Sequence, residues 1–268
     1  EYDVWGRPKA LRSPTYGQTY VNDATYDALG RLDWVQFGDG YQTDYTYNSP
    51  TTQGGRLLEI QSGTSGDPDA IQRLEYDYDS VGNVHAITDT LNAGQMQTFT
   101  YDALDRLTQA QTNAAGTDRY NRSYQYNTIG NTTYFEGVYY EYNNSSHKHA
   151  VTHKVWPPNP AVEYCRYDAN GNMWQRYWNS AWQTLTYDYE NRLVSVSGSG
   201  TGSFAYDADG NRVWQTVGGV EIHYVWDWVE SGTVYYYFGG RKVAMRGAGG
   251  VSYLYADQVS STTNTSHG

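Results

Sequence analysis

Asp or Asn occupies alternate positions around a glycine at two places in this 268-residue chain, residues 168–172 and 207–211. Alternating oxygen ligands around a glycine-permitted turn are typical of calcium loops. Such a loop also needs a distal bidentate glutamate, and neither segment has one at that spacing. Both segments are copies of a motif that recurs along the chain. We therefore interpret them as turns, and we predict no metal site.

Three histidines, His147, His149 and His153, could supply imidazole ligands to a transition metal. No cysteine or carboxylate follows them at a useful spacing. The glycine-rich segment 198–203 could cradle a phosphate, but that chemistry requires a helix directly after the loop. The following residues predict a strand, so we interpret the segment as a hairpin loop.

Catalytic motifs are also missing. Acidic pairs such as Asp67/Asp69 and Asp77/Asp79 could serve glycoside cleavage only if a groove set two carboxylates at a catalytic separation, and the sequence does not place them so. Neither a G-x-S-x-G nor an H-E-x-x-H motif occurs. We predict that the chain is not an enzyme and binds no cofactor.

Aromatic residues are abundant and mostly amphipathic, with 29 Tyr and 9 Trp but only 5 Phe. Such side chains stack on the apolar faces of sugar rings, so carbohydrate binding at a cell surface is an alternative function. The tryptophans that could contribute are Trp174, Trp178, Trp182, Trp214, Trp226 and Trp228.

The formal net charge of −11 argues against nucleic-acid binding, which needs a basic face. No apolar run approaches the length of a transmembrane helix, so we predict no membrane insertion. The single cysteine, Cys165, cannot form an internal disulfide, and its strand position predicts a buried side chain. Because the chain begins without Met and inside a repeat, we expect it to be a fragment of something longer.

The most informative feature is a six-residue motif, Tyr-Asp/Asn-x-x-Gly-Arg/Asn, that occurs eight times. The copies are typically a little over twenty residues apart, and self-similarity at such a period indicates that the fold is built from repeated structural units. Position five is Asp105 or Asn191 where it is not glycine, and these types best tolerate positive φ after glycine. Asp or Asn at position two can close a turn by accepting a hydrogen bond from the backbone two residues on. The predicted turn residues are Tyr2, Asp3, Gly6; Tyr26, Asp27, Gly30; Tyr78, Asp79, Gly82; Tyr101, Asp102, Asp105; Tyr126, Asn127, Gly130; Tyr167, Asp168, Gly171; Tyr187, Asp188, Asn191; and Tyr206, Asp207, Gly210.

Alternating residues on both sides of each motif predict strands. The residue two before the motif Tyr is apolar or aromatic and shares its face, as for Ala24, Tyr76, Phe99, Tyr124, Cys165, Leu185 and Phe204. Each repeat is therefore predicted to be a β-hairpin, and hairpins must pair edge to edge to be stable. We expect the motif tyrosines to line the interior. We also expect the arginines at position six to pair with acids of neighbouring repeats (Arg7, Arg31, Arg106 and Arg192).

This pattern strongly resembles the YD-repeat, or Rhs, family, which includes Rhs toxin shells, the B/C cocoons of insecticidal toxin complexes and the teneurin shell. The resemblance covers nearly all of residues 1–268, with degenerate repeats near 41–75 and 134–160 and a late Rhs-core-like segment at 220–268. It implies an all-β ribbon of hairpins that spirals into a hollow shell or tube. The family's autoproteolytic motif should lie beyond the Asp257 region, so self-cleavage does not carry over, and no separate toxin or protease domain is visible.

The size of the ribbon limits what it can enclose. About 24 strands at about 4.8 Å each give a ribbon about 115 Å long, which would close at a diameter of about 37 Å. A folded domain of about 100 residues is itself over about 30 Å across. The chain therefore cannot enclose a folded toxin domain by itself. We expect it to be an extracellular or cell-surface wall segment, joined to further YD repeats or to copies of itself in a shell, tube or filament. The strands near 16–20 and 251–255 are expected to be open edges, since neither carries Lys or Pro.

Overall fold

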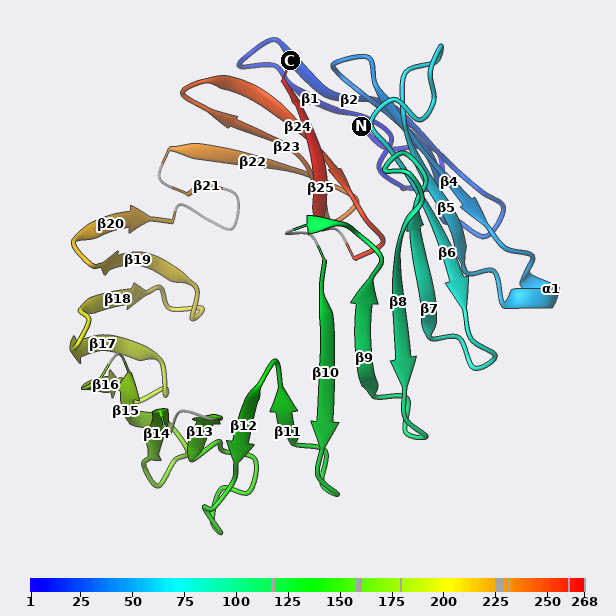
Figure 1. Ribbon diagram of the computed structural model, residues 1–268. Helices are drawn as coiled ribbons and strands as arrows, with labels where there is room; N and C mark the ends of the chain where they lie inside the picture. The colour runs from blue at the N-terminus through cyan, green and yellow to red at the C-terminus, as the bar shows by residue number, and fades with distance from the viewer. Residues whose placement is uncertain are drawn as a thin grey trace. The chain divides into compact units, whose positions relative to one another are not determined.

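The computed structural model describes residues 1–116, 119–157, 161–178, 180–224, 229–230, 232–259 and 261–267. The predicted all-β fold of repeated hairpins is confirmed: 25 strands and one short helix make up the secondary structure of these residues (Figure 1). The helix, α1 (Pro50–Gln53), lies in the first degenerate repeat. No helix among the described residues is long and apolar enough to cross a lipid bilayer.

Twenty strands form one sheet. They are β1 (Leu11–Ser13), β2 (Gln18–Tyr26), β3 (Leu32–Phe37), β4 (Gln42–Tyr47), β5 (Leu57–Gly63), β6 (Gln72–Tyr78), β7 (Val84–Asp89), β8 (Gln95–Tyr101), β9 (Leu107–Thr112), β10 (Asn121–Tyr126), β11 (Thr132–Phe135), β12 (Val138–Glu141), β13 (His153–Trp156), β14 (Ala161–Tyr167), β15 (Met173–Trp178), β16 (Ala181–Tyr187), β17 (Leu193–Gly198), β18 (Gly202–Tyr206), β19 (Arg212–Val217) and β20 (Val220–His223).

A second sheet has five strands. They are β21 (Val229–Glu230), β22 (Thr233–Phe238), β23 (Arg241–Gly247), β24 (Gly250–Ala256) and β25 (Thr262–His267). In both sheets the strands pair antiparallel with their neighbours in sequence, for example β2 with β3 and β23 with β24. This order is the one that short hairpin connections allow.

The register shifts next to the motif Tyr in a recurring way. Thr25 pairs with Trp34, but the next residue, Tyr26, pairs with Leu32, so Asp33 is left as the extra residue of a β-bulge. The same shift occurs before Tyr78, Tyr167, Tyr187 and Tyr206. Bulges bend a strand and increase its twist, so the repeat places a bend at the same point of successive hairpins.

The chain divides into two compact units. Unit 1 comprises Glu1–Arg106, Ala110–Asn121 and Gly232–Gly268, and unit 2 comprises Leu107–Gln109 and Arg122–Ser231. The boundaries do not follow the sequence order, because the C-terminal sheet belongs to the same unit as the first strands.

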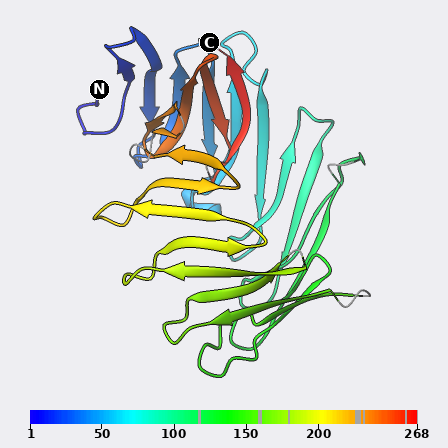
Figure 2. The ribbon, with the colours of Figure 1, turned by 90° about the vertical axis from the view of Figure 1, so that its left-hand side faces the viewer.

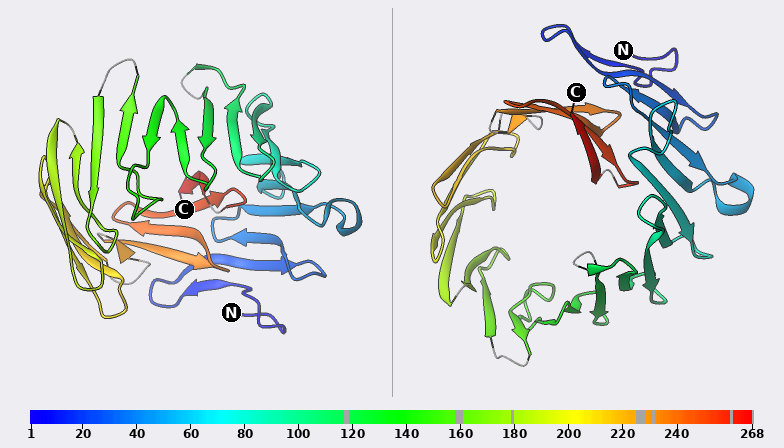
Figure 3. Two further views of the ribbon diagram at one scale, coloured as in Figure 1. Left: turned by 90° about the horizontal axis from the view of Figure 1, so that it is seen from below. Right: turned by 45° about the horizontal axis from the view of Figure 1, so that its top comes forward.

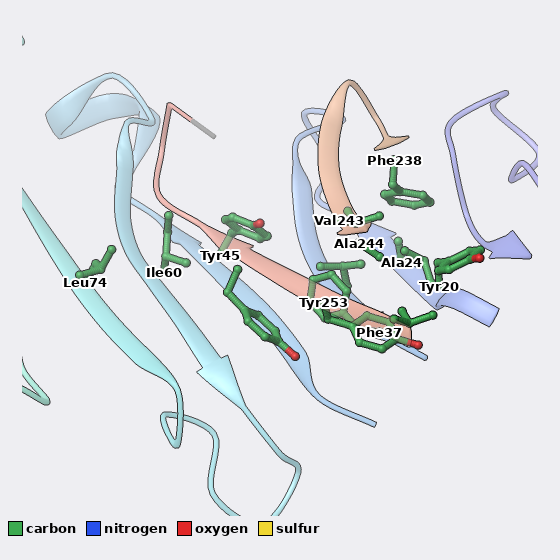
Figure 4. Close-up of a cluster of buried hydrophobic side chains, with 14 of the residues drawn as sticks. Tyr20, Ala24, Phe37, Tyr45, Ile60, Leu74, Phe238, Val243, Ala244 and Tyr253 are labelled. Atoms are coloured by element: carbon green, nitrogen blue, oxygen red, sulfur yellow. The ribbon is translucent and has the colours of Figure 1, made fainter. Parts of the chain in front are cut away.

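Unit 1 has two layers. Strands β22–β25, drawn in orange to red, lie against the blue strands that begin the chain (Figures 1 and 3). The core between the layers takes side chains from both sheets (Figure 4). Tyr253 and Tyr20 are fully buried there, and Phe37 packs edge-on against Tyr253 with 6.3 Å between ring centroids. The layers therefore hold each other through aromatic side chains from opposite ends of the sequence.

Unit 2 is a single sheet of consecutive antiparallel strands, seen side by side in Figure 2. Of its described residues, only Asn131, Cys165, Gln183 and Gly202 are buried. Cys165 is a free thiol, and burial raises its pKa, which confirms the predicted buried cysteine. Most other side chains in this unit are half-buried or exposed.

Two strands predicted to be open edges are interior instead. Strand β24, with residues 251–255, pairs with both β23 and β25, and β2 pairs with both β1 and β3. The strand outside β2 is β1, and the segment that leads into β1 carries Pro8 and Lys9, residues that blunt edge pairing. The prediction was wrong because the sequence alone did not show the hairpins outside these strands.

Candidate functional site

The motif builds the same tight turn in each repeat. In the second copy the amide of Asp27 donates to the carbonyl of Arg31 at 2.9 Å, and the amide of Gly30 donates to the carbonyl of Asp27 at 3.0 Å. Oδ1 of Asp27 accepts from the amides of Leu29 and Arg31, both at 2.9 Å. One carboxylate thus satisfies two turn amides that no backbone carbonyl reaches.

Position five has positive φ in all eight copies, and the side chain at position two accepts backbone hydrogen bonds in each. The φ values at position five are 75° at Gly6, 79° at Gly30, 104° at Gly82, 57° at Asp105, 89° at Gly130, 88° at Gly171, 61° at Asn191 and 86° at Gly210. The corresponding acceptors are Asp3, Asp27, Asp79, Asp102, Asn127, Asp168, Asp188 and Asp207. Only a small set of residues tolerates such a backbone, which explains the restricted choice at this position.

The arginines at position six pair within their own repeat. Nε of Arg31 donates to Oδ2 of Asp27 at 2.7 Å, and the same pairing joins Arg192 to Asp188 at 2.8 Å. The expected pairing with acids of neighbouring repeats was therefore wrong. The physical reason is that Oδ1 of the aspartate is fixed by the turn, which aims Oδ2 back at position six.

Three of these arginines, Arg7, Arg31 and Arg192, also reach the next repeat through an aromatic ring. The guanidinium of Arg7 lies 4.5 Å from the ring centroid of Tyr26, and that of Arg31 lies 3.9 Å from the ring centroid of Tyr47. A guanidinium at such a distance over an aromatic face is attracted by the ring. Position six therefore links its own turn to the motif Tyr that follows.

The motif Tyr completes this link with its hydroxyl. It donates to the carbonyl directly after position six of the preceding repeat, and we call this contact the tyrosine link. Nine such bonds, 2.6–3.0 Å long, join Tyr26 to Pro8, Tyr47 to Leu32, Tyr78 to Leu57, Tyr101 to Val84, Tyr126 to Leu107, Tyr142 to Thr132, Tyr167 to Val151, Tyr187 to Met173 and Tyr206 to Leu193. Tyr2, the first motif Tyr, is exposed.

The electrostatics of the turns follow from these contacts. The side-chain hydrogen bond from Arg106 lowers the pKa of Asp102, and the backbone hydrogen bond from Arg192 lowers that of Asp188. Burial raises the pKa of Tyr167 to about 12. Each group is thus held in one protonation state near neutral pH, acids charged and phenols neutral, which suits a structural contact.

Some turns carry little or no sequence signal. Asp257 forms the same turn with Ser261, its amide donating to the Ser261 carbonyl at 3.0 Å, although Ala256 stands where the Tyr would be. In the first degenerate repeat the amide of Asn48 donates to the Arg56 carbonyl at 2.8 Å, across the α1 insertion. These turns share with the motif an Asp or Asn whose amide donates to the carbonyl that closes the turn.

The histidines, the glycine-rich segment and the acidic residues considered as candidate sites take part in contacts that support the fold. Nδ1 of His149 lies 2.6 Å from Oδ1 of Asn131, and Nδ1 of His153 lies 3.0 Å from Oγ1 of Thr152. No three His, Cys, Asp or Glu side chains of the described residues are grouped so that they could hold a metal ion. Segment 198–203 connects two strands, and Asp77 lies beside His85 on the exposed face of its strand.

The tryptophans do not form one surface. Trp174 and Trp178 are exposed, while Trp182 and Trp214 are half-buried. Trp226 and Trp228 lie outside the described residues.

Comparison with known proteins gives two findings. Residues 78–118 match the family model described as RHS Repeat, whereas no curated protein matches the sequence. The fold is similar to the crystal structure of TcdB2–TccC3 (TM-score 0.67) and to that of TcdB2–TccC3–Cdc42 (TM-score 0.63), each at 17% identity. Each match covers 99% of this chain but only 16% of the solved chain. Residues 78–118 thus match an RHS repeat, and the fold of the whole chain is similar to that of the two TcdB2–TccC3 structures, in agreement with the resemblance that the motif indicated.

Proposed function

We propose that this chain is a non-catalytic wall segment of a larger extracellular assembly. The observation that carries the proposal is the tyrosine link, which recurs nine times with the same direction, from the hydroxyl of a later repeat to the carbonyl of an earlier one. A repeat joined in this way can always accept another, from the same chain or from a second copy, because each interface is of the same head-to-tail kind.

Two further observations support a wall rather than an enzyme. The motif side chains use their polar atoms on turn amides, strand carbonyls and each other, which leaves no activated nucleophile or acid–base pair among them. The solved chains with this fold are about six times longer than the part that aligns with it. A segment of 268 residues is thus proposed to act as part of a more extensive sheet.

The wall has two proposed forms. In the first, copies of the chain join edge to edge and build a tube or filament. In the second, the chain is a section of a closed cage that encapsulates a toxin. Exposed aromatic side chains such as Trp5 and Tyr16 offer apolar surface for joining in the first form.

Cryo-electron microscopy of the native material, together with mass measurement of the purified chain at increasing concentration, tests the proposal. Continuous sheet running from one copy of the chain to the next, with tyrosine links across the junction, is the expected result for a tube. Closed particles with further repeats on the same polypeptide support the cage. A monodisperse monomer at high concentration and isolated single chains in the native material would contradict both forms.

A further inference from the structure

A hollow lies on the surface of unit 2 beside β13 and β14, and the motif does not explain it. Its volume is about 470 Å³, within the range of about 300–1,000 Å³ that is usual for small-ligand sites. The loop after β12 contributes Asn143 and Asn144, and the strands contribute His153, Tyr164 and Arg166. Ser145, Thr152 and Cys165 complete the lining. One aromatic ring together with amides, hydroxyls, an imidazole and a guanidinium suits a ligand with both a flat face and polar groups.

The hollow continues into a row of rings across four neighbouring strands. His153 pairs in register with Tyr164, and Tyr177 pairs with Trp182, so these side chains share one face of the sheet. The ring centroids of Tyr164 lie 5.0 Å from His153 and 6.4 Å from Trp182. Four strands at about 4.8 Å spacing make a row about 14 Å long, which matches a short oligosaccharide better than a single sugar.

Tyr164 is the ring best placed to meet a ligand. It is 41% exposed, whereas the other three rings of the row are half-buried. The face of the sheet that carries Tyr164 is opposite to the face that carries Cys165 and the motif Tyr167, because successive residues of a strand point to opposite sides. The ring row is therefore independent of the tyrosine links.

Arg166 gives the hollow its charge. Its guanidinium lies 4.4 Å from the Trp182 ring centroid, and Nη1 donates to Oε1 of Gln175 at 2.9 Å. No carboxylate of the described residues lies within 4.0 Å of it, although the chain has 29 acidic residues. Glu141 pairs in register with His153 and so lies on this face, where its carboxylate is 3.0 Å from Nδ2 of Asn143 and 3.7 Å from Nδ1 of His153. Arg166 is thus a cation held by a ring, without a paired anion.

We propose that this hollow binds an oligosaccharide that carries a carboxylate. The sugar ring stacks on Tyr164, the carboxylate pairs with the planar fork of Arg166, and hydroxyl groups bond to Asn143, Asn144 and His153. The net charge of −11 does not prevent this, since charges beyond a Debye length of about 8–10 Å are largely screened. The proposal does not depend on the wall function.

The test is a titration of the intact chain with trigalacturonate, with a hyaluronan tetrasaccharide and with sialyllactose. Tryptophan fluorescence and calorimetry measure the binding. Maltotriose and inorganic phosphate are the neutral and non-sugar controls. We expect saturable binding of at least one acidic saccharide, with neither control binding comparably. Binding of none of the three, or equal binding of maltotriose or phosphate, would overturn the proposal.

Variants locate the site. Arg166→Gln is expected to weaken binding at least tenfold, and Tyr164→Ala to abolish the fluorescence change. Arg166→Lys keeps the charge but not the fork, so it should give an intermediate affinity. Tyr189→Ala, at a fully exposed turn residue, is the matched control and should bind as the parent does. Urea unfolding of each variant verifies folding, and unchanged affinity in folded Arg166→Gln would place any binding elsewhere.

Discussion

The two units show how differently the same motif is used. In unit 1 the first strands are covered by β22–β25, and the residues two before Tyr26 and Tyr78 are buried, with Ala24 5% and Tyr76 3% exposed, whereas Phe99 before Tyr101 is half-buried. In unit 2 the large side chains at this position, Tyr124, Leu185 and Phe204, are half-buried, and only the smaller Cys165 is buried. The motif therefore specifies a hairpin and its link to the next hairpin, and a second layer supplies the burial.

This difference implies different sources of stability. Unit 1 combines the repeat contacts with burial of large aromatic side chains, which stabilises by about 25 cal/mol per Å² of apolar surface removed from water. Unit 2 relies more on its backbone ladder and its tyrosine links. Removing an aromatic ring should therefore cost most in unit 1, whereas changes to the turn itself should cost the same in both.

Loss of a buried aromatic side chain should have the largest effect. Tyr253→Ala removes a fully buried ring whose hydroxyl donates to the Thr19 carbonyl at 3.0 Å, and we expect it to lower the free energy of unfolding by about 3–5 kcal/mol. Phe204→Ala in unit 2 should cost only about 1–2 kcal/mol. Urea unfolding measures both, and equal losses would show that the second layer adds nothing.

Turn geometry should matter equally in the two units. A Cβ at Gly30 or Gly210 would meet no atom within 4 Å, so the penalty of Gly30→Val or Gly210→Val comes from positive φ alone and should be about 1–3 kcal/mol. The control is asparagine at the same positions, which Asn191 shows to be compatible with the turn. Thermal or urea unfolding tests this, and a valine that costs no more than asparagine would disprove the turn's dependence on φ.

Removal of one tyrosine hydroxyl should have a smaller effect that depends on access to water. Tyr47→Phe in unit 1 leaves the Leu32 carbonyl without its donor, and Tyr187→Phe in unit 2 does the same to Met173. We expect a loss of about 0.5–1.5 kcal/mol, greater for Tyr47 because the second layer limits water. Tyr189→Phe, at an exposed residue, should have no effect. A larger loss of unfolding free energy for Tyr187→Phe than for Tyr47→Phe would contradict the expected difference between the two units.

Acid should weaken the turns in both units to a small and similar extent. The pKa values of Asp102 and Asp188 are lowered in the folded state, so their contribution is present above the unfolded value of about 3.9 and is lost as pH falls through the folded value. Asp102→Asn or Asp188→Asn should reduce this loss, since Asn127 accepts the same turn amides. Urea midpoints at neutral pH and near pH 3 give the comparison. If the parent and the Asn variants lost the same stability between the two pH values, these carboxylates would not be the source of the acid sensitivity.

The turns could be predicted because their information is local. Asp105 and Asn191 in place of glycine pointed to positive φ, and the alternation around each motif Tyr pointed to the shared strand face. The second layer could not be predicted, since it depends on contacts such as Tyr253 with Thr19, which are 234 residues apart. No periodic pattern in one sequence shows which distant strands will meet.

The aromatic row and Arg166 were missed for the same reason. The sequence showed abundant tryptophan, but the relevant neighbours are set by the registers of β13 with β14 and of β15 with β16. Arginine pairing was assigned to the wrong partner because the direction of a carboxylate depends on the turn that holds it. Side-chain direction is thus the kind of information that the three-dimensional structure added.

The tyrosine link also bears on how such a chain can change its length over generations. Each link joins only two adjacent repeats, so duplicating or deleting one whole unit of about twenty residues creates one new junction of the same chemistry as those before it. A recombination event in the array is therefore compatible with folding if the new junction places a motif tyrosine 10–21 residues after the carbonyl that it meets, the range of the existing links. Genes of this kind can be lengthened by copying, without a new core having to be invented.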